Sequence, residues 1–298
     1  MKNRAQIHLL PDGRRLFLHD GPIDIVLEAF GPQYEIKAAY QAAADRFVTV
    51  LDELCAELPN LRTGAGPRAP LLHGPVAQRM GAAVAPYAKR WFITPMAAVA
   101  GAVAEEILLA MTSTTHLDRA YVNDGGDIAL HLEHGHFTAG MVDTPEGGSQ
   151  FGSALLKATQ PVRGIATSGW RGRSFSLGIA DAVTVLADRA AMADAAATII
   201  ANAVDLPSHP NIQRAPARDL APDSDLGGRL VTQAVGHLSS HEISCALDSG
   251  LETANILLFE GLIRAAALNL RGETRMVGSP MHLISREQTA DDRGLIHA

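Results

Sequence analysis

The stretch Val122-Asn123-Asp124-Gly125-Gly126-Asp127-Ile128 separates two runs of apolar, strand-forming residues. Asparagine, aspartate and glycine are the usual residues of tight turns, and glycine accepts the positive φ angles that such turns require. The simplest interpretation is therefore a turn between two strands. A second interpretation stays open, because paired glycines also let backbone N–H groups approach a bound phosphate closely.

A second stretch, Gly164-Ile165-Ala166-Thr167-Ser168-Gly169, ends a predicted strand in small and hydroxyl-bearing residues. Backbone carbonyl and hydroxyl groups at such a strand end are able to face a metal ion or a nucleotide. They are equally well explained by a Ser/Thr turn that follows the strand. The order Gly-x-Ser-x-Gly is absent, so a nucleophile elbow is not indicated.

A third stretch, Met192-Ala193-Asp194-Ala195-Ala196-Ala197-Thr198, lies in a predicted helix over residues 191–204. Asp194 and Thr198 are four residues apart and therefore share one face of that helix. A carboxylate and a hydroxyl one turn apart offer the hard oxygen ligands that Mg²⁺ prefers. Alternatively, Asp194 stabilises a helix N-terminus and Thr198 bonds back to a carbonyl of the preceding turn.

Strand-like and helix-like segments are mixed along the chain without strict alternation, which predicts the α+β class, with helices packed on mixed β-sheets. Pro11-Asp12-Gly13 joins one predicted hairpin, and residues 133–136 close another. The predicted strands cover residues 6–10, 15–19, 23–27, 120–122, 128–132, 137–142, 162–168, 182–187, 229–235 and 265–271. The predicted helices cover residues 34–58, 75–87, 95–112, 191–204 and 241–262. We expect a single domain over residues 1–283, with a linker-like stretch over residues 205–228 and a loose tail over residues 284–298.

Composition and charge exclude several classes of partner. The net charge is −7 and no basic patch with interleaved aromatic residues occurs, so nucleic acid is not an expected partner. No secretory signal is recognised at the start, and the longest apolar stretch contains Glu105 and Glu106, so we expect a cytoplasmic protein and no membrane partner. Cys55 and Cys245 are expected to be buried, unreactive thiols. The alanine-rich helices would suit a helix-mediated homodimer.

The order of the three stretches carries more information than any one of them. ApbE-type flavin transferases contain an Asn-x-Gly-Gly-Asp turn, then a strand ending in Ala-Thr-Ser-Gly, then a helix beginning Ala-Asp-Ala-x-Ala-Thr. The chain resembles this superfamily over residues 120–204, with weaker likeness in the flanking parts. The resemblance implies an ApbE-like (T-fold-like) architecture and an FAD:protein FMN transferase activity that depends on Mg²⁺.

The resemblance also implies roles for particular residues. The metal ligands would be Asp194, Thr198 and the backbone oxygen of Ala166. The residues that hold the flavin nucleotide would be Asn123, Gly125, Gly126, Asp127, Thr167, Ser168 and Gly169. In the family, Mg²⁺ bridges the pyrophosphate of FAD while FMN passes to a Ser or Thr hydroxyl of a client protein. The matched motifs assign no further catalytic residue.

The resemblance fails in one segment. The transferases carry His-Ile-x-Asp-Pro-x-Thr-Gly-x-Pro between the strand end and the helix, whereas residues 170–181 contain neither a histidine nor an Asp-Pro pair. The chain therefore resembles a shortened branch of the superfamily. Arg171 and Arg173 could replace lost phosphate contacts or be ordinary exposed strand residues.

Two functional hypotheses follow from this mixture of match and mismatch. The leading hypothesis is a flavin-nucleotide-related Mg²⁺ protein that transfers FMN from FAD to a protein Ser or Thr. The retained Asp194 and Thr198 pair favours it. The alternative is a non-catalytic ApbE-like protein that binds a small anionic ligand or a partner protein, and the missing segment favours that alternative.

The remaining polar motifs have local explanations. His131, His134 and His136 lie near a predicted hairpin tip but match no zinc spacing, so a solvated turn is expected there. Ser239 or Ser240 is a natural N-cap for the last long helix, where an acidic residue also suits the first turn.

Overall fold

The computed structural model describes residues 4–142, 150–279, 281–283 and 295–297. The chain divides into two compact units, each assembled from segments that are distant in sequence. The first unit comprises Met1–His136, Lys157–Ile165 and Asp188–Asp194, and the second comprises Phe137–Leu156, Ala166–Ala187 and Ala195–Ala298. This division does not test the expectation of a single domain over residues 1–283, which stays a prediction.

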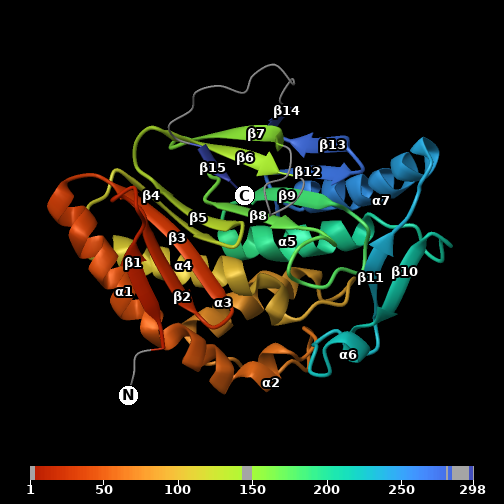
Figure 1. The fold of residues 1–298 in the computed structure, drawn as a ribbon, viewed down its shortest axis with the longest axis horizontal. Helices are drawn as coiled ribbons and strands as arrows, with labels where there is room; N and C mark the ends of the chain where they lie inside the picture. Colours follow the sequence, from red (N-terminus) through yellow and green to blue (C-terminus); the bar gives the residue numbers. More distant parts are fainter. Residues whose placement is uncertain (1–3, 143–149, 280, 284–294, 298) are drawn as a thin grey trace. The chain divides into compact units, whose positions relative to one another are not determined.

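The sheet of the first unit is antiparallel, and its strands follow the order β1-β2-β3-β4-β5-β8 (Figure 1). These strands are β1 (Gln6–Leu9), β2 (Leu16–Asp20), β3 (Ile23–Phe30), β4 (Arg119–Asp124), β5 (Asp127–Leu132) and β8 (Gly164–Ser168). Only the first two residues of β8 belong to this unit. Buried and partly exposed residues alternate along β2 and the first half of β3, which is typical of strands with one face on a core. The predicted first hairpin, β1 with β2, is confirmed.

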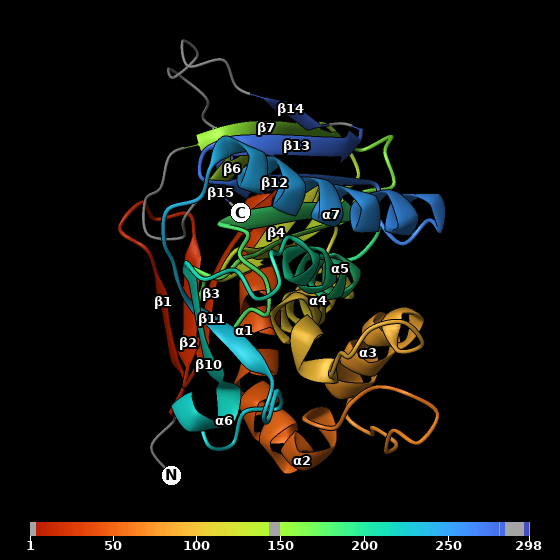
Figure 2. The ribbon, with the colours of Figure 1, turned by 90° about the vertical axis from the view of Figure 1, so that its right-hand side faces the viewer.

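Helices α1 (Gln33–Ala56) and α4 (Val99–Thr112) pack against this sheet and against each other (Figure 2). Buried residues recur at every third or fourth position along α1, as expected for a helix with one apolar face. Helix α3 (Pro75–Val84) packs on α4, and proline opens it because the first helical N–H needs no partner. The short helices α2 (Leu58–Leu61), η1 (Ala85–Tyr87) and η2 (Pro95–Ala98) complete the helical layer.

The segment Pro95–Thr112 is long and apolar enough to cross a membrane by length and composition alone. Half of it is buried inside the structure, and Glu105 and Glu106 in its middle form ion pairs with three arginines. Apolar core helices pass the same length test, and charged side chains are rarely buried unless they are paired. The contacts therefore mark α4 as a core helix of the first unit.

The second unit contains parts of three sheets. The end of β8 is followed in strand order by β9 (Ala182–Ala187), β12 (Ala265–Leu270) and β13 (Glu273–Gly278), and α7 (Ser240–Phe259) packs on β12 and β13 (Figure 2). A separate sheet has the order β14-β7-β6-β15, formed by β6 (His136–Val142), β7 (Gln150–Lys157), β14 (Met281–Leu283) and β15 (Leu295–His297). Strands β10 (Ile212–Pro216) and β11 (Leu230–Val235) pair with each other, and α6 (Ala217–Leu220) follows β10. Helix α5 (Ala190–Ala203) begins in the first unit and continues into the second.

The structure corrects the predicted hairpin of residues 128–132 with residues 137–142. Strand β5 pairs with β4 and β8, whereas β6 belongs to the separate four-stranded sheet. The reason is that β4 and β8 occupy both edges of β5, and the bend over residues 133–135 carries the chain to the other sheet. Apolar alternation identifies a strand but does not identify its partner.

Two further expectations about local structure are wrong, and two strands were not predicted. The linker-like stretch over residues 205–228 contains β10 and α6, and Arg214 pairs with Asp205 within it. Strands β7 and β13 lie where no strand is predicted. Cys55 and Cys245 are exposed, because their helices turn these positions outward. In the expected tail, residues 284–294 and 298 lie outside the described residues, and Leu295–His297 form β15.

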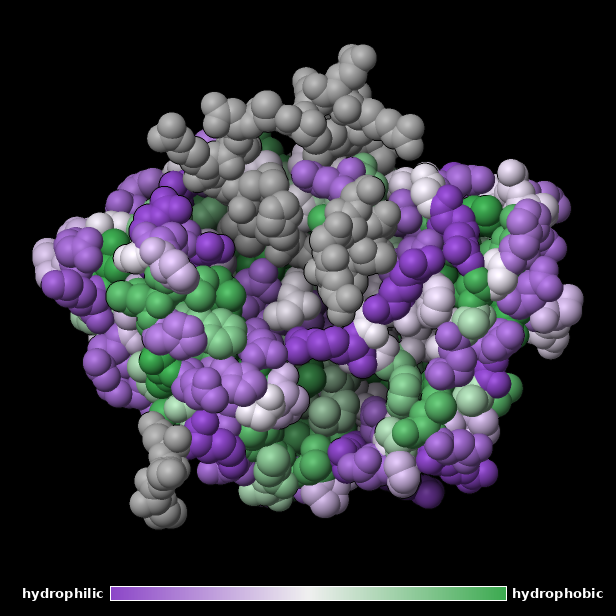
Figure 3. All heavy atoms as spheres, in the orientation of Figure 1, coloured by the Kyte–Doolittle hydropathy of each residue, from purple (hydrophilic) through white to green (hydrophobic). Residues whose placement is uncertain are grey.

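The α+β class is confirmed, because antiparallel and mixed sheets carry helices that do not alternate strictly with the strands. Hydrophilic and apolar residues are interspersed over the face drawn in Figure 3. Such a mixture is ordinary for a folded chain, because polar groups alone cannot cover the surface.

Candidate functional site

The Gly-Gly turn closes the β4–β5 hairpin. Asp124 and Asp127 face each other in the ladder, so Gly125 and Gly126 are the two turn residues, with φ angles of 65° and 107°. The Oδ1 atom of Asn123 accepts the N–H of Gly126 at 2.8 Å and so braces the turn. The predicted turn is confirmed, and Asn123 has a structural role in it. Contact of these residues with a flavin nucleotide stays a prediction.

The Thr-Ser-Gly strand end belongs to the second unit. Oγ1 of Thr167 lies 2.9 Å from Oγ1 of Thr184 on the neighbouring strand β9. A Cβ atom on Gly169 would overlap the backbone oxygen of Asp181, so only glycine fits at this position. Ser168 is partly exposed, whereas Ala166 is buried and offers only its backbone. The strand end is therefore built from close backbone packing and one hydroxyl pair.

Asp181 organises the segment over residues 170–181, which lacks the histidine and the Asp-Pro pair. Its Oδ1 accepts the Nε1–H of Trp170 at 3.0 Å and the Nε–H of Arg171 at 2.8 Å. Its Oδ2 accepts the backbone N–H of Arg271 at 2.6 Å. Arg171 therefore neutralises a nearly buried carboxylate, a role that neither the phosphate interpretation nor the exposed-strand interpretation foresaw. Only the three-dimensional structure brings these partners together.

Asp194 lies in the first turns of α5 and contacts the first turn of α4. Its Oδ2 accepts the N–H of Gly101 at 3.0 Å. Gly101 is the third residue of α4, where N–H groups have no partner inside their own helix, and Ala98 before the helix offers no side-chain cap. A Cβ atom on Gly101 would lie 2.5 Å from the backbone oxygen of Ala190, so glycine permits this close approach. Asp194 therefore caps a helix other than its own.

The environment of Asp194 favours its protonated form. Burial raises the pKa of Asp194 to about 7, and the backbone N–H groups of Gly101 and Ala100 offset only part of this effect. The carboxyl group is therefore poised to exchange a proton near neutral pH. A cation at this position would have to displace that proton, so its binding would be pH-dependent.

We expect the raised pKa of Asp194 to make the free energy of unfolding fall as pH rises from about 4 to about 7. The folded state holds a proton there that the unfolded state has already released, so stability is lost as pH approaches the folded pKa. Asp194→Asn removes the titration and keeps an oxygen that accepts the N–H of Gly101. Calorimetric Tm values without metal should show the variant gaining on the wild type from pH 5 to pH 8. An equal difference at every pH would contradict the raised pKa.

Thr198 lies one turn after Asp194 on α5. Both residues are partly exposed, whereas Ala193 and the three alanines between the pair are buried. Asp194 and Thr198 are therefore less buried as residues than the alanines between them, while the Asp194 carboxyl group itself lies against the first turn of α4. Their assignment as metal ligands, together with Ala166, stays a prediction.

By ligand chemistry alone, the predicted donor set would suit Mg²⁺ if a phosphate group completed it. One carboxylate, one hydroxyl and a backbone carbonyl are hard oxygen ligands, but they carry a single negative charge. Mg²⁺ in proteins commonly takes one or two carboxylates, several waters and the phosphates of a substrate. In the part of the chain that the structure describes, no cluster of three or more histidine, cysteine, aspartate or glutamate side chains could hold a metal ion alone. A site built on Asp194 and Thr198 would therefore depend on its anionic ligand.

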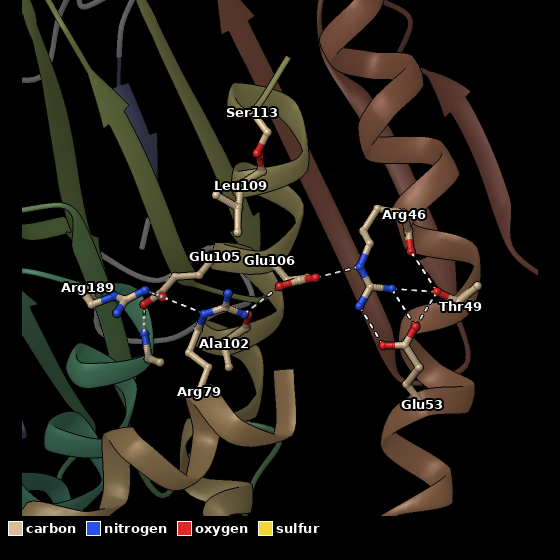
Figure 4. Close-up of polar contacts among 11 residues, drawn as sticks. Arg46, Thr49, Glu53, Arg79, Ala102, Glu105, Glu106, Leu109, Ser113 and Arg189 are labelled. Carbon is tan, nitrogen blue, oxygen red and sulfur yellow. Dashed lines mark hydrogen bonds and ion pairs between the residues drawn. The ribbon is translucent and has the colours of Figure 1, made fainter. Parts of the chain in front are cut away.

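A chain of alternating charges that the sequence did not predict links α1, α3, α4 and Arg189 in the first unit (Figure 4). Arg79 lies between the two glutamates of α4: its Nη1 is 2.9 Å from Glu106, and its Nε is 3.1 Å from Glu105. Glu106 also binds Arg46 of α1 at 2.7 Å, and Glu105 lies 3.2 Å from Nη2 of Arg189. The adjacent glutamates in an otherwise apolar helix were the visible signal of this network.

Glu105 also caps helix α5. Its Oε1 accepts the backbone N–H of Ala191, the second residue of α5, at 2.9 Å. Asp194 of α5 caps α4 in the same way, so the two helix N-termini exchange carboxylates. The partial positive charge of a helix N-terminus favours negative charge at both positions, but at Asp194 burial outweighs this effect.

The other polar candidates have structural roles. Nε2 of His131 lies 3.0 Å from the backbone oxygen of Leu117, and His134 and His136 are exposed beside the bend, as expected for a solvated turn. Ser239 and Glu242 form a complete capping box at the start of α7, so the predicted N-cap is confirmed.

Comparison with known proteins places the chain in a family. The model of the family described as "AbpE bacteria" matches residues 7–276, so the chain belongs to this family, an ApbE-like branch. A UPF0280 protein of Methanopyrus kandleri is 36% identical over 189 residues, which cover 62% of this chain and 71% of that protein. A UPF0280 protein of Methanothermobacter thermautotrophicus is 39% identical over 116 residues, which cover 39% of this chain and 44% of that protein.

One solved structure covers nearly the whole chain. A variant of the flavin transferase ApbE from Vibrio cholerae matches 92% of this chain and 97% of its own, at 12% identity and a TM-score of 0.35.

Proposed function

We propose that the protein binds a flavin nucleotide through Mg²⁺ held by Asp194 and Thr198, and that it transfers FMN from FAD to a Ser or Thr hydroxyl of a client protein. One observation carries this proposal: Asp194 and Thr198 are partly exposed residues one turn apart on α5, among buried alanines, and the Asp194 carboxyl group lies against the first turn of α4. Membership of an ApbE-like family supports the flavin as ligand.

The physical argument concerns the free-energy cost of burying the charged carboxylate of Asp194. Burial disfavours its charged form, which is why the pKa of Asp194 rises to about 7. If Asp194 had only a structural role, an apolar residue in its place would remove this cost and lose only the cap on the N–H of Gly101. Perturbed carboxylates beside further polar groups are characteristic of functional sites.

In the proposed transfer, the client hydroxyl oxygen bonds to the FMN phosphorus as the bond to AMP breaks, and the hydroxyl proton is released. Bound Mg²⁺ would neutralise charge on the pyrophosphate. Asp194 and Thr198 would hold the metal, with the backbone oxygen of Ala166. The resemblance gives the turn around Gly125 and the strand end at Thr167 the task of holding the nucleotide. We also propose that the protein acts on a client protein, forms a homodimer and is cytoplasmic. These three parts of the proposal rest on the sequence.

A second function has its own support. The segment over residues 170–181 lacks the family's histidine and Asp-Pro pair, and Asp181 closes it by binding Trp170 and Arg171. A protein whose pocket has lost that segment would bind an anionic ligand without transferring it. This alternative keeps the metal-dependent binding and removes the chemistry.

Calorimetric titration with FAD, with and without Mg²⁺, tests the proposal. We expect binding that requires Mg²⁺ and strengthens as pH rises through about 7, because Asp194 must lose its proton to hold the cation. Release of AMP on addition of Ser- and Thr-containing peptides would support transfer. Mg²⁺-dependent binding without AMP release would favour the non-catalytic alternative. FAD binding that ignores both Mg²⁺ and pH would contradict the metal site.

A further inference from the structure

We propose that Glu105 is a positioning residue, which fixes the carboxylate of Asp194 for metal binding by holding the first turn of α5. This inference rests on the proposed metal site. Glu105 would touch neither the metal nor the nucleotide. It would act through Ala191, whose N–H it binds at 2.9 Å, three residues before Asp194.

Glu105 is held by one hydrogen bond and two ion pairs, although its Oε2 atom is buried without a hydrogen-bond partner. Oε1 accepts the N–H of Ala191, and Oε2 lies 3.1 Å from Nε of Arg79 and 3.2 Å from Nη2 of Arg189 (Figure 4). The side chain is only 10% exposed, which leaves it little freedom to move. The first turn of α5 is therefore linked to α4 through the Oε1 atom of Glu105.

Asp194 returns the same contact one turn earlier on α4. It accepts the N–H of Gly101, and Glu105 follows Gly101 by four residues, so both contacts lie on one face of α4. The close approach of Gly101 to Ala190 leaves no room for the helices to shift towards each other. Removing Glu105 would release one of two anchors and let the Asp194 carboxylate reorient.

A contribution to the stability of the fold does not by itself explain why the charge of Glu105 is buried. An ion pair replaced by well-packed apolar residues is often neutral or stabilising, so a buried glutamate in an apolar helix is weak evidence for a stability role. Glu106 provides the internal comparison. It is equally buried, at 9% exposure, and pairs with Arg46 and Arg79, but it caps no residue of α5.

The test compares Glu105→Met with Glu106→Met, two substitutions that keep the side-chain volume similar. In both variants Arg79 keeps one glutamate, and in Glu106→Met the partner of Arg46 is Glu53 at 2.7 Å. Arg189, which loses its partner in Glu105→Met, is 61% exposed and remains solvated. We therefore expect both variants to fold, with similar losses in Tm.

The readout is the binding of Mn²⁺, a spectroscopic substitute for Mg²⁺, in the presence of FAD, followed by the electron paramagnetic resonance of free Mn²⁺. Glu105→Met should weaken binding roughly 10–100-fold, as loss of an outer-shell partner does. Glu106→Met should leave it unchanged. Glu105→Gln, whose amide oxygen still accepts the N–H of Ala191, should restore most of the affinity.

Equal weakening in Glu105→Met and Glu106→Met, or no rescue by Glu105→Gln, would overturn the positioning role. Wild-type protein that binds no Mn²⁺ would instead contradict the proposed function. In that case, hydrogen exchange of the Gly101 amide in the metal-free protein still tests whether Glu105 positions Asp194. Faster exchange in Glu105→Met alone would support positioning of Asp194, and equal exchange in both variants would refute it.

Discussion

Asp194→Asn is expected to weaken Mg²⁺-dependent FAD binding by more than the roughly 10–100-fold that outer-shell partners contribute to metal sites. The substitution removes the one negative charge of the proposed donor set and leaves an amide oxygen that accepts the N–H of Gly101 at the present 3.0 Å. The cap on α4 should therefore survive while the cation loses its charged ligand. Titration calorimetry at pH 8, where the wild-type carboxyl group is ionised, measures the difference.

Thr198 supplies the matched pair of controls for this experiment. Thr198→Ser keeps the hydroxyl and should bind FAD and Mg²⁺ nearly as the wild type does. Thr198→Val has almost the same shape without the hydroxyl and should bind more weakly. If Asp194→Asn bound as tightly as the wild type, the metal site would be elsewhere and Asp194 would be a helix cap only.

Gly178→Ala is expected to lower the free energy of unfolding by about 3 kcal/mol or more, at the upper end of what overpacking costs. A Cβ atom at this position would overlap the backbone oxygen of Ala201 and lie 2.8 Å from that of Val204. Backbone atoms cannot rotate away as a side chain would. The next residue, Ile179, donates its N–H to Val204 at 2.8 Å, so relief of the overlap would break that bond.

Gly172 is the control from the same segment. Its Cβ would lie 3.3 Å from the backbone oxygen of Gly169, and the residue is exposed, so Gly172→Ala should change stability by about 0.5 kcal/mol or less. Urea unfolding of both variants, followed by circular dichroism, measures the two values. Equal stability of Gly178→Ala and the wild type would mean that the end of α5 is packed more loosely than described.

Local chemistry allowed much of the fold to be predicted from sequence. The Pro-Asp-Gly and Gly-Gly turns, the amphipathic spacing of α1 and the capping residue Ser239 all act within a few positions. Strand pairing does not, because β5 and β6 are similar apolar runs that join different sheets. The polar stretch around β10 was unrecognised for a related reason: its order comes from Arg214, which binds Asp205 and the backbone of Leu177.

The local features of the candidate site could also be predicted from the sequence, whereas its long-range contacts could not. Helical periodicity alone puts Asp194 and Thr198 on one face, and the order of the motifs indicated the family. The partners of Asp194 and Asp181 could not be predicted, because Gly101 and Arg271 lie about 90 positions away in sequence. The same holds for Glu105, which was visible as a charge in an apolar helix but not as the cap of α5.

The two capping contacts, Asp194 with α4 and Glu105 with α5, can form only late during synthesis of the chain. Gly101 emerges from the ribosome 93 residues before Asp194, and Glu105 emerges 86 residues before Ala191. At about 5–20 residues per second, α4 waits roughly 5–20 s for the carboxylate that completes its first turn. During that interval the nascent chain exposes the open end of α4 together with a glutamate that has no helix to cap. A chain that ended before residue 188 would lack both capping contacts, so we expect the first turn of α4 to be less stable in it than in the full chain.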